Sequence, residues 1–133
     1  MDANLMNISK IEVFFDNLLR STDKVDKLSK NIFYTHLPAA MDRSWKEMIL
    51  VDIENVEDLG VGMGLINVFI YVKARGDGRK NVTELNKVSS RLNELIASNS
   101  DVHYHISRAR TYSDYDDARK MDCDVVSLKI MIV

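Results

Sequence analysis

The chain contains very little that could cross-link a small protein. Its 133 residues include one cysteine, Cys123, so no disulfide can form within the chain and no cysteine-rich zinc site can be built. Cys123 lies in an apolar, alternating segment, and no positioned base is apparent nearby that would activate its thiol. We therefore expect a buried, unreactive thiol and a reducing compartment.

Long apolar runs and a dominant charge are missing too. No stretch approaches the ~20 apolar residues of a transmembrane helix, and residues 1–10 lack the basic leader and apolar run of a signal peptide. The net charge of −2 differs from the basic excess of a typical nucleic-acid-binding protein. These absences predict a soluble, intracellular protein that contacts neither a membrane nor a nucleic acid.

The composition that is present is typical of a globular domain. Hydrophobic residues make up 46% of the chain and charged residues 29%, a balance that allows a buried core and argues against disorder. A chain of this length usually forms one domain and buries roughly two-thirds of its unfolded surface. Because the chain shows no internal repeat and no low-complexity segment, we expect a single domain over residues 1–133.

Two segments repeat their apolar residues at helical spacing. The first covers residues 11–19. The second covers residues 85–96 and follows Asn81 and Glu84, which have the spacing of a helix cap and its partner. Each helix is expected to bury one apolar stripe. The stripe of the second helix consists of Leu85, Val88, Leu92, Leu95 and Ile96.

Several further segments have the composition or the alternation of strands. They cover residues 31–37, which end at the only proline, Pro38, and residues 48–54, 65–74, 102–107 and 125–133. Arg75 and Arg79 flank a Gly-Asp-Gly turn after the third of these strands. Residues 108–122 are polar and charged, and we interpret them as a long loop that acts as a docking arm.

The elements follow the order α-β-β-β-α-β-β and predict the α+β class. Short links between consecutive strands favour antiparallel pairing. We expect a mostly antiparallel sheet of about five strands with two helices packed on one face. The stripe of the second helix should pack on two strands, against Ile66, Val68, Ile70, Val126, Leu128 and Ile130.

No motif in the chain points to catalysis. The glycines within residues 60–64 are not followed by the lysine and the serine or threonine of a phosphate-binding loop. Asp114, Asp116 and Asp117 lack the glycine and the closing glutamate of a calcium loop. We therefore predict that the protein is not an enzyme and has no catalytic residue, no cofactor and no bound metal.

The three histidines suggest an alternative. His103 and His105 are two residues apart on a predicted strand, so they share a face, and His36 could complete a set of three metal ligands if its strand lay alongside. The alternative function is therefore a small intracellular domain that binds a ligand or a metal through the apolar sheet face and His103/His105.

The strand over residues 65–74 is apolar on both of its faces. One face carries Leu65, Phe69 and Tyr71, and it is the face opposite the predicted helices. Candidates for the same face on other strands are Leu50, Val125 and Met131. Large exposed apolar patches are rare on monomers, so we expect either the chain's own loops or a neighbouring subunit to cover this face.

The order of elements resembles that of the tail terminator, or tail completion, proteins of long-tailed phages and prophages. The resemblance spans nearly the whole chain, from the helix at residues 11–19 to the strand at residues 125–133. Its most family-like portion is the strand pair EMILVDI and LINVFIYVKA, followed by a charged turn and an amphipathic helix. The early glycine-rich link is shorter, and residues 108–122 are longer and more charged, than this family pattern leads us to expect.

The resemblance implies a structural role. Such proteins form a ring, commonly a hexamer, that caps the tail tube and joins it to the head. The implied partners are further copies of the chain, the tail tube and the head–tail connector proteins, in the host cytoplasm during assembly and then in the virion tail. The residues expected at subunit contacts are Leu65, Phe69, Tyr71, Arg75, Arg79, Arg108, Arg110, Tyr112 and Tyr115.

Overall fold

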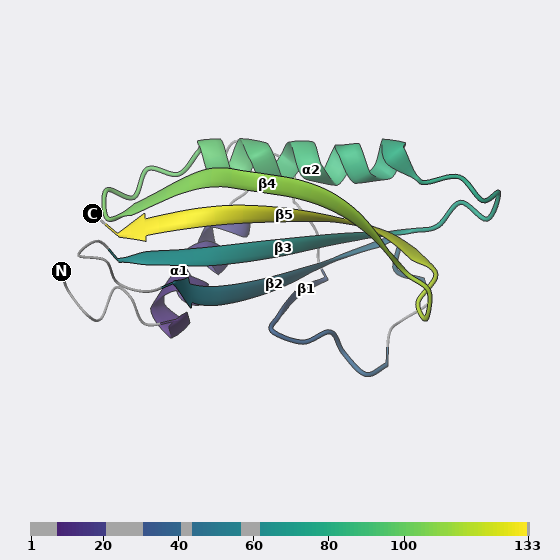
Figure 1. The fold of residues 1–133 in the computed structure, drawn as a ribbon, viewed down its shortest axis with the longest axis horizontal. Coiled ribbons are helices and arrows are strands. Elements are labelled where there is room, and N and C mark those ends of the chain that lie inside the picture. The colour runs from purple at the N-terminus through teal and green to yellow at the C-terminus, as the bar shows by residue number, and fades with distance from the viewer. Residues whose placement is uncertain (1–7, 21–30, 41–43, 57–61, 133) are drawn as a thin grey trace.

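The computed structural model describes residues 8–20, 31–40, 44–56 and 62–132, which form one sheet and two helices (Figure 1). The observed order of elements is the predicted one, α-β-β-β-α-β-β. The elements are α1 (Ile8–Leu19), β1 (Ile32–Tyr34), β2 (Glu47–Val56), β3 (Met63–Lys73), α2 (Val82–Ala97), β4 (Tyr104–Asp116) and β5 (Met121–Ile132). Neither described helix is long and apolar enough to cross a membrane.

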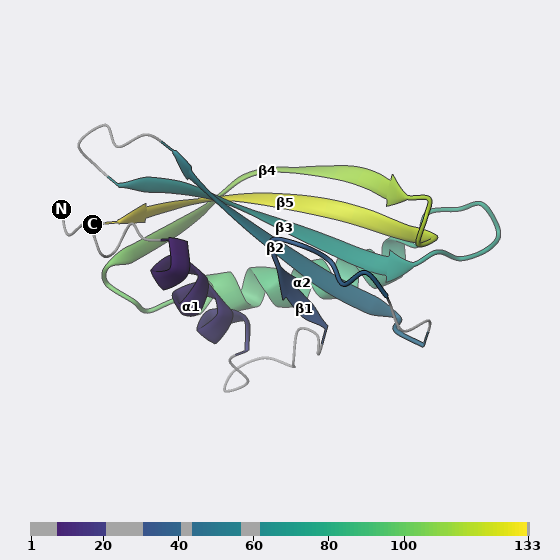
Figure 2. The ribbon, with the colours of Figure 1, turned by 90° about the horizontal axis from the view of Figure 1, so that it is seen from below.

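The five strands lie in the order β1-β2-β3-β5-β4, and both helices pack on one face of the sheet (Figure 2). All neighbouring pairs are antiparallel except β1 and β2, which are parallel. The predicted α+β class, a mostly antiparallel sheet with two helices on one face, is therefore confirmed. We call the face opposite the helices the open face.

The helix-covered face holds the main core. Leu85, Val88, Leu92 and Leu95 of α2 are buried, and they belong to one cluster with the inward side chains of β3 and β5. Ile11, Phe15 and Leu19 of α1 join the same cluster. The predicted packing of α2 on Ile66, Val68, Ile70, Val126, Leu128 and Ile130 is thus confirmed.

α2 begins where the sequence predicts, but the hydrogen bonds at its first residues differ from those of the predicted cap. Asn81 is the N-cap residue, yet its side chain makes no capping hydrogen bond. Its amide group instead donates to the carbonyl oxygen of Lys73 at 2.9 Å. Its backbone N–H donates to the carboxylate of Asp122, on β5, at 2.8 Å. A carboxylate from the sheet therefore lies at the positive end of the helix dipole.

The first strand is shorter than predicted. β1 ends at Tyr34 because Thr35 adopts a left-handed backbone conformation, with φ of 69°, which interrupts an extended strand. Since β1 and β2 are parallel, the connection between them must return to the starting end of the sheet. Two described residues of that connection, Leu37 and Trp45, pack on the open face.

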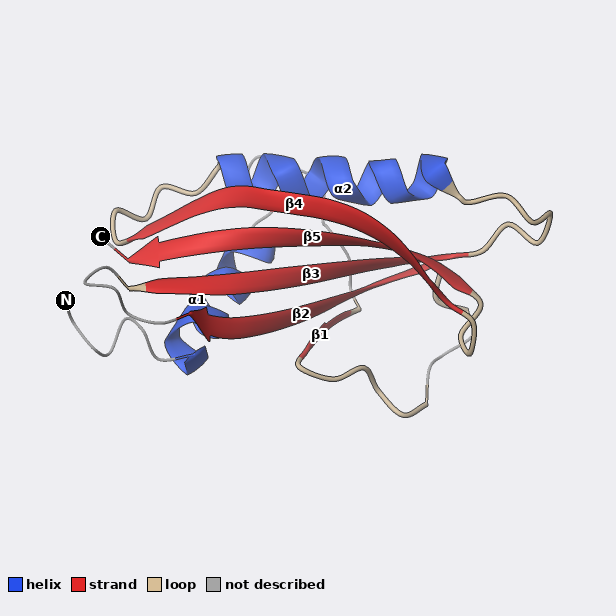
Figure 3. Cartoon of the chain, in the orientation of Figure 1, coloured by secondary structure: helices blue, strands red, loops and turns tan. Residues whose placement is uncertain are grey.

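The prediction of a long loop over residues 108–122 is wrong. β4 continues to Asp116 and β5 begins at Met121, so only residues 117–120 form a turn (Figure 3). A register shift between Arg108 and Arg110 marks a bulge in β4. The side chains of residues 107–115 are all exposed, which explains why they lack the alternation of a half-buried strand. Their pairing with β5 makes this segment a strand.

Candidate functional site

One end of the open face is closed by the chain itself. Three residues from β1 and the connection that follows it, Phe33, Leu37 and Trp45, pack over this end, and we call them the aromatic cap. The rings of Phe33 and Trp45 lie 5.6 Å apart. Beneath the cap, the buried side chains are Met48, Tyr71, Met121, Cys123 and Val125.

Two residues beneath the aromatic cap had sequence predictions attached to them. Tyr71, expected at a subunit contact, has 9% of its surface exposed, and burial raises the pKa of its hydroxyl well above its usual value. Cys123, expected to be buried and unreactive, is only 2% exposed, and burial raises the pKa of its thiol to about 12. The thiol is therefore protonated at neutral pH and is not a nucleophile.

The remainder of the open face is less covered. Leu65, Asn67 and Phe69 of β3 are partly buried, and Tyr112 of β4 is 43% exposed. The Phe69 ring stacks beside that of Tyr71, with centroids 6.4 Å apart, so Phe69 borders the capped end. In the view that faces this surface, no described segment of the chain crosses it (Figure 1). We call Leu65, Asn67, Phe69 and Tyr112 the open half.

β4 brings some of the predicted contact residues to the open face and turns others away. Directly opposite residues of an antiparallel pair share a face. Arg110 and Tyr112 are opposite Ser127 and Val125 and so lie on the open face, where the Arg110 guanidinium stands 5.1 Å from the Tyr112 ring centre. Arg108 and Tyr115 are opposite Leu128 and Asp122, on the helix side. The contact residues predicted on β4 therefore do not form a single patch.

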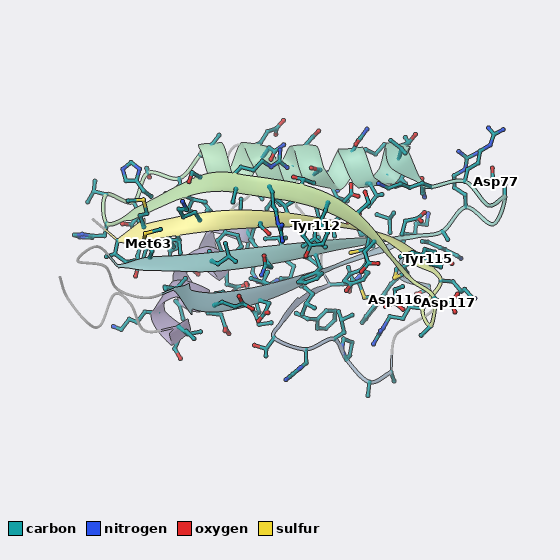
Figure 4. All side chains as sticks on the ribbon, viewed as in Figure 1. Met63, Asp77, Tyr112, Tyr115, Asp116 and Asp117 are labelled. Atoms are coloured by element: carbon teal, nitrogen blue, oxygen red, sulfur yellow. The ribbon has the colours of Figure 1, made fainter. Side chains whose placement is uncertain are left out.

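The turn between β3 and α2 extends away from the sheet (Figure 4). Arg75 and Arg79 are both exposed there, and the Arg75 guanidinium forms an ion pair of 2.6 Å with the Asp77 carboxylate. Gly76 and Gly78 have positive φ values, 69° and 81°, which explains the Gly-Asp-Gly sequence of this turn. The turn extends past the end of the sheet, where it is accessible to a neighbouring molecule (Figure 4).

A groove of about 880 Å³ lies where this turn meets the capped end. Trp45 and Met121 provide apolar walls, while Lys73, Arg119 and Lys120 provide positive charge. Arg119 is paired with Asp116 at 2.9 Å and Lys120 with Asp117 at 3.1 Å. Two of the three cations are thus already neutralised, and the groove has no charge arrangement that selects an anion.

The three histidines do not meet. His105 lies on β4 and His103 just before it, whereas His36 follows β1, at the opposite edge of the sheet. Four strand spacings separate β1 from β4, which amounts to roughly 19 Å. Among the described residues, no three His, Cys, Asp or Glu side chains are grouped so that they could hold a metal ion. His36 therefore cannot complete the metal site considered as an alternative.

The positions of two side chains, Trp45 over the open face and Asp122 at the start of α2, could not be predicted from the sequence. The sequence around Trp45 weakly indicated its burial, because a lone tryptophan between two apolar segments often folds back on a core. Its position over the open face, however, depends on the parallel pairing of β1 with β2. No local pattern indicated the role of Asp122, because its hydrogen bond with Asn81 joins residues that are 41 positions apart in the sequence.

Comparison with known proteins does not assign the chain to a family. A scan against protein-family models found no match to the chain, and a search of curated proteins found none either.

Proposed function

We propose that this chain is a non-enzymatic structural subunit that assembles with copies of itself, in the manner of a phage or prophage tail terminator. The observation that carries the proposal is the open half of the sheet, where Leu65 and Phe69 are only partly buried and Tyr112 is 43% exposed. Apolar side chains that a sheet leaves partly exposed are often covered by another element, and a neighbouring subunit is a covering that fits a sheet.

The shape of the open half favours a protein over a small molecule. Small ligands bind in concave sites that bury most of their surface. The open half is the surface of a sheet, and the groove of about 880 Å³ lies at the other, capped end. A partner that covers the open half must therefore present a broad surface of its own.

A ring requires two different patches that meet between neighbours. Closed rings form when one patch contacts a different patch on the next subunit and the rotation closes. The open half supplies the first patch, and the exposed turn that carries Arg75 and Arg79 is a candidate for the second. The order of elements adds support, because it is the order that resembles tail terminators.

Sedimentation velocity at increasing protein concentration tests the self-assembly. We expect the wild-type chain to form oligomers larger than a dimer and Phe69→Asp to lose them, because a carboxylate would be buried at the contact. The matched control is Val82→Asp, since Val82 is 49% exposed on α2 and lies on the other side of the sheet. Circular dichroism checks that both variants remain folded. Equal loss in both variants would contradict the proposal.

The tail-terminator role needs a second measurement, because a ring can depend on the tube end as a template. Purified chain would be added to growing tubes of the tail-tube protein encoded by the same genome. We expect the chain at one end of each tube in electron micrographs, and we expect tube growth to stop. Tubes that keep their length distribution and carry no chain at either end would contradict the role.

A further inference from the structure

β4 forms one outer edge of the sheet. Within the described part of the chain it pairs only with β5, and its residues 107–115 are all exposed. α2 packs against β3 and β5 behind the sheet (Figure 2). An edge strand of 13 residues presents a row of backbone N–H and C=O groups that can pair with another strand.

The side chains along this edge are arranged symmetrically about Tyr112. Arg110 stands two residues before Tyr112, and Asp114 stands two residues after it. All three lie on the open face, because they are opposite Ser127, Val125 and Cys123 of β5. Reversing the strand therefore exchanges the positive position with the negative one.

We propose that β4 pairs antiparallel with β4 of a second copy of this chain, with Tyr112 on the two-fold axis. In this register Arg110 of each copy lies directly opposite Asp114 of the other, so two cross-strand ion pairs form. Opposite-charge pairs at directly facing positions stabilise a sheet, with Cβ atoms about 4.5–5.5 Å apart. The two sheets join into one continuous sheet, with both open faces on the same side.

The opposite side of the strand fits the same register. Thr111 of one copy faces Ser113 of the other, and hydroxyl pairs of this kind also stabilise facing strands. The Ser113 hydroxyl donates to Asp124 at 2.9 Å and accepts from Lys80, which leaves it one lone pair for the Thr111 hydroxyl.

Other registers lose the charge match. A parallel, in-register pair places Arg110 against Arg110 and Asp114 against Asp114. An antiparallel pair centred on Arg110 or on Asp114 places that charge opposite its own copy. Facing like charges destabilise a sheet. The charges of Arg110 and Asp114 therefore favour the register centred on Tyr112 and disfavour these alternatives. Charged side chains on edge strands commonly prevent uncontrolled pairing in this way.

This contact is separate from the ring of the proposed function. It uses the edge of the sheet rather than the apolar surface around Phe69, and a two-fold contact closes on itself as a dimer. If the ring also forms, this contact would join two rings or two neighbouring assemblies. If no ring forms, the dimer is still expected.

Charge reversal tests the register directly. The parent protein for this test is the full chain with Phe69→Asp, which lacks the proposed ring contact. Its sedimentation equilibrium, from micromolar to millimolar concentration, should show a dimer of two 15.2 kDa chains. Arg110→Asp and Asp114→Arg each create two facing like-charge pairs, and each should raise the dissociation constant by roughly tenfold or more. The double variant restores opposite charges at both positions and should recover the dissociation constant of the parent protein.

The control for this experiment is a matched reversal elsewhere. Arg75→Asp and Asp77→Arg change the same charges in an exposed ion pair on the turn, and we expect neither to alter the dimer. A monomer at all concentrations, or single reversals without effect, or a double variant that fails to recover dimerisation, would overturn the inference. Loss of rings in Phe69→Asp with the dimer retained would support it, since that variant leaves β4 unchanged.

Cross-linking gives a second test that does not depend on charge. On the proposed axis, the two Tyr112 Cα atoms would be about 4.5–5.5 Å apart, within the range that a disulfide spans. Tyr112→Cys should therefore form a disulfide-linked dimer under mild oxidation, whereas Ser107→Cys on the same strand should not. Native Cys123 does not compete, because it is 2% exposed. Equal cross-linking at both positions would overturn the register.

Discussion

On the helix-covered face, β3 presents Ile66, Val68 and Ile70, which are fully buried beneath α1 and α2. On the opposite face the same strand presents Leu65 and Phe69, which are only partly buried. Both sets are apolar, so hydrophobicity alone does not decide which face is closed. The difference lies in the covering segments, because the two helices bury the inward side chains of β3 and the aromatic cap covers only one end of the other face.

The largest expected effect lies in the helix-covered core. Leu92→Ala removes a side chain that is 0% exposed between α2 and the sheet, and it should lower the free energy of unfolding by about 2–5 kcal/mol. The measurement is urea unfolding followed by circular dichroism. Asn93→Ala, at the next and exposed position of α2, is the control and should stay close to the wild type. If the urea midpoint of Leu92→Ala equals that of the wild type, Leu92 is not part of the core.

The helix-covered face could be predicted from the sequence because its pattern is local. Alternation in β3 and β5 and the stripe of α2 identify the buried positions without knowledge of the pairing. β4 could not be predicted, since a strand that is exposed on both sides has no apolar alternation and depends on hydrogen bonds with β5. The burial of Tyr71 was missed for a similar reason, because it follows from the path of the connection between β1 and β2.

The capped end of the open face should show an intermediate effect. Trp45→Ala removes the largest part of the aromatic cap and should cost roughly 1–3 kcal/mol, less than a fully buried tryptophan because Trp45 is only partly buried. Leu65→Ala, on the open half, should cost less. A second readout is the thiol of Cys123, which should react faster with a thiol reagent in Trp45→Ala. If Leu65→Ala is the more destabilising change, the two ends of the open face have been assigned in reverse.

A smaller effect is expected where the sheet holds the start of α2. Asp122→Ala removes the carboxylate that accepts the backbone N–H of Asn81, and by analogy with the loss of a helix cap it should cost about 1 kcal/mol. Asp122→Asn keeps an acceptor oxygen and should recover part of that loss. Thermal unfolding of the three proteins measures the difference. Equal stability of Asp122→Ala and the wild type would mean that the Asn81 N–H is satisfied in another way.

The smallest effect concerns Glu47, at the rim of the helix-covered face. Burial raises the pKa of its carboxyl above the ordinary value, the nearby Arg91 guanidinium lowers it, and Glu84 adds to the rise. The nearest Arg91 and Glu47 side-chain atoms are 3.9 Å apart, and 27% of the Glu47 side chain is exposed. The charged form is therefore slightly less favourable in the folded protein than in the unfolded chain, and the effect is limited by solvent.

The sign of the pH dependence follows from this raised pKa. Glu47 stabilises the folded state most when it is protonated, below its ordinary pKa, and that contribution is lost as the pH rises through the higher pKa of the folded state. Glu47→Gln removes the titration, so its stability relative to the wild type should be greatest at neutral pH and should fall as the pH is lowered through this window. We expect a difference of a few tenths of a kcal/mol in urea unfolding. Glu94→Gln, at an exposed position of α2, corrects for the change in net charge. A Glu47→Gln variant that is less stable than the wild type at neutral pH and gains on it in acid would show that the Arg91 ion pair outweighs burial.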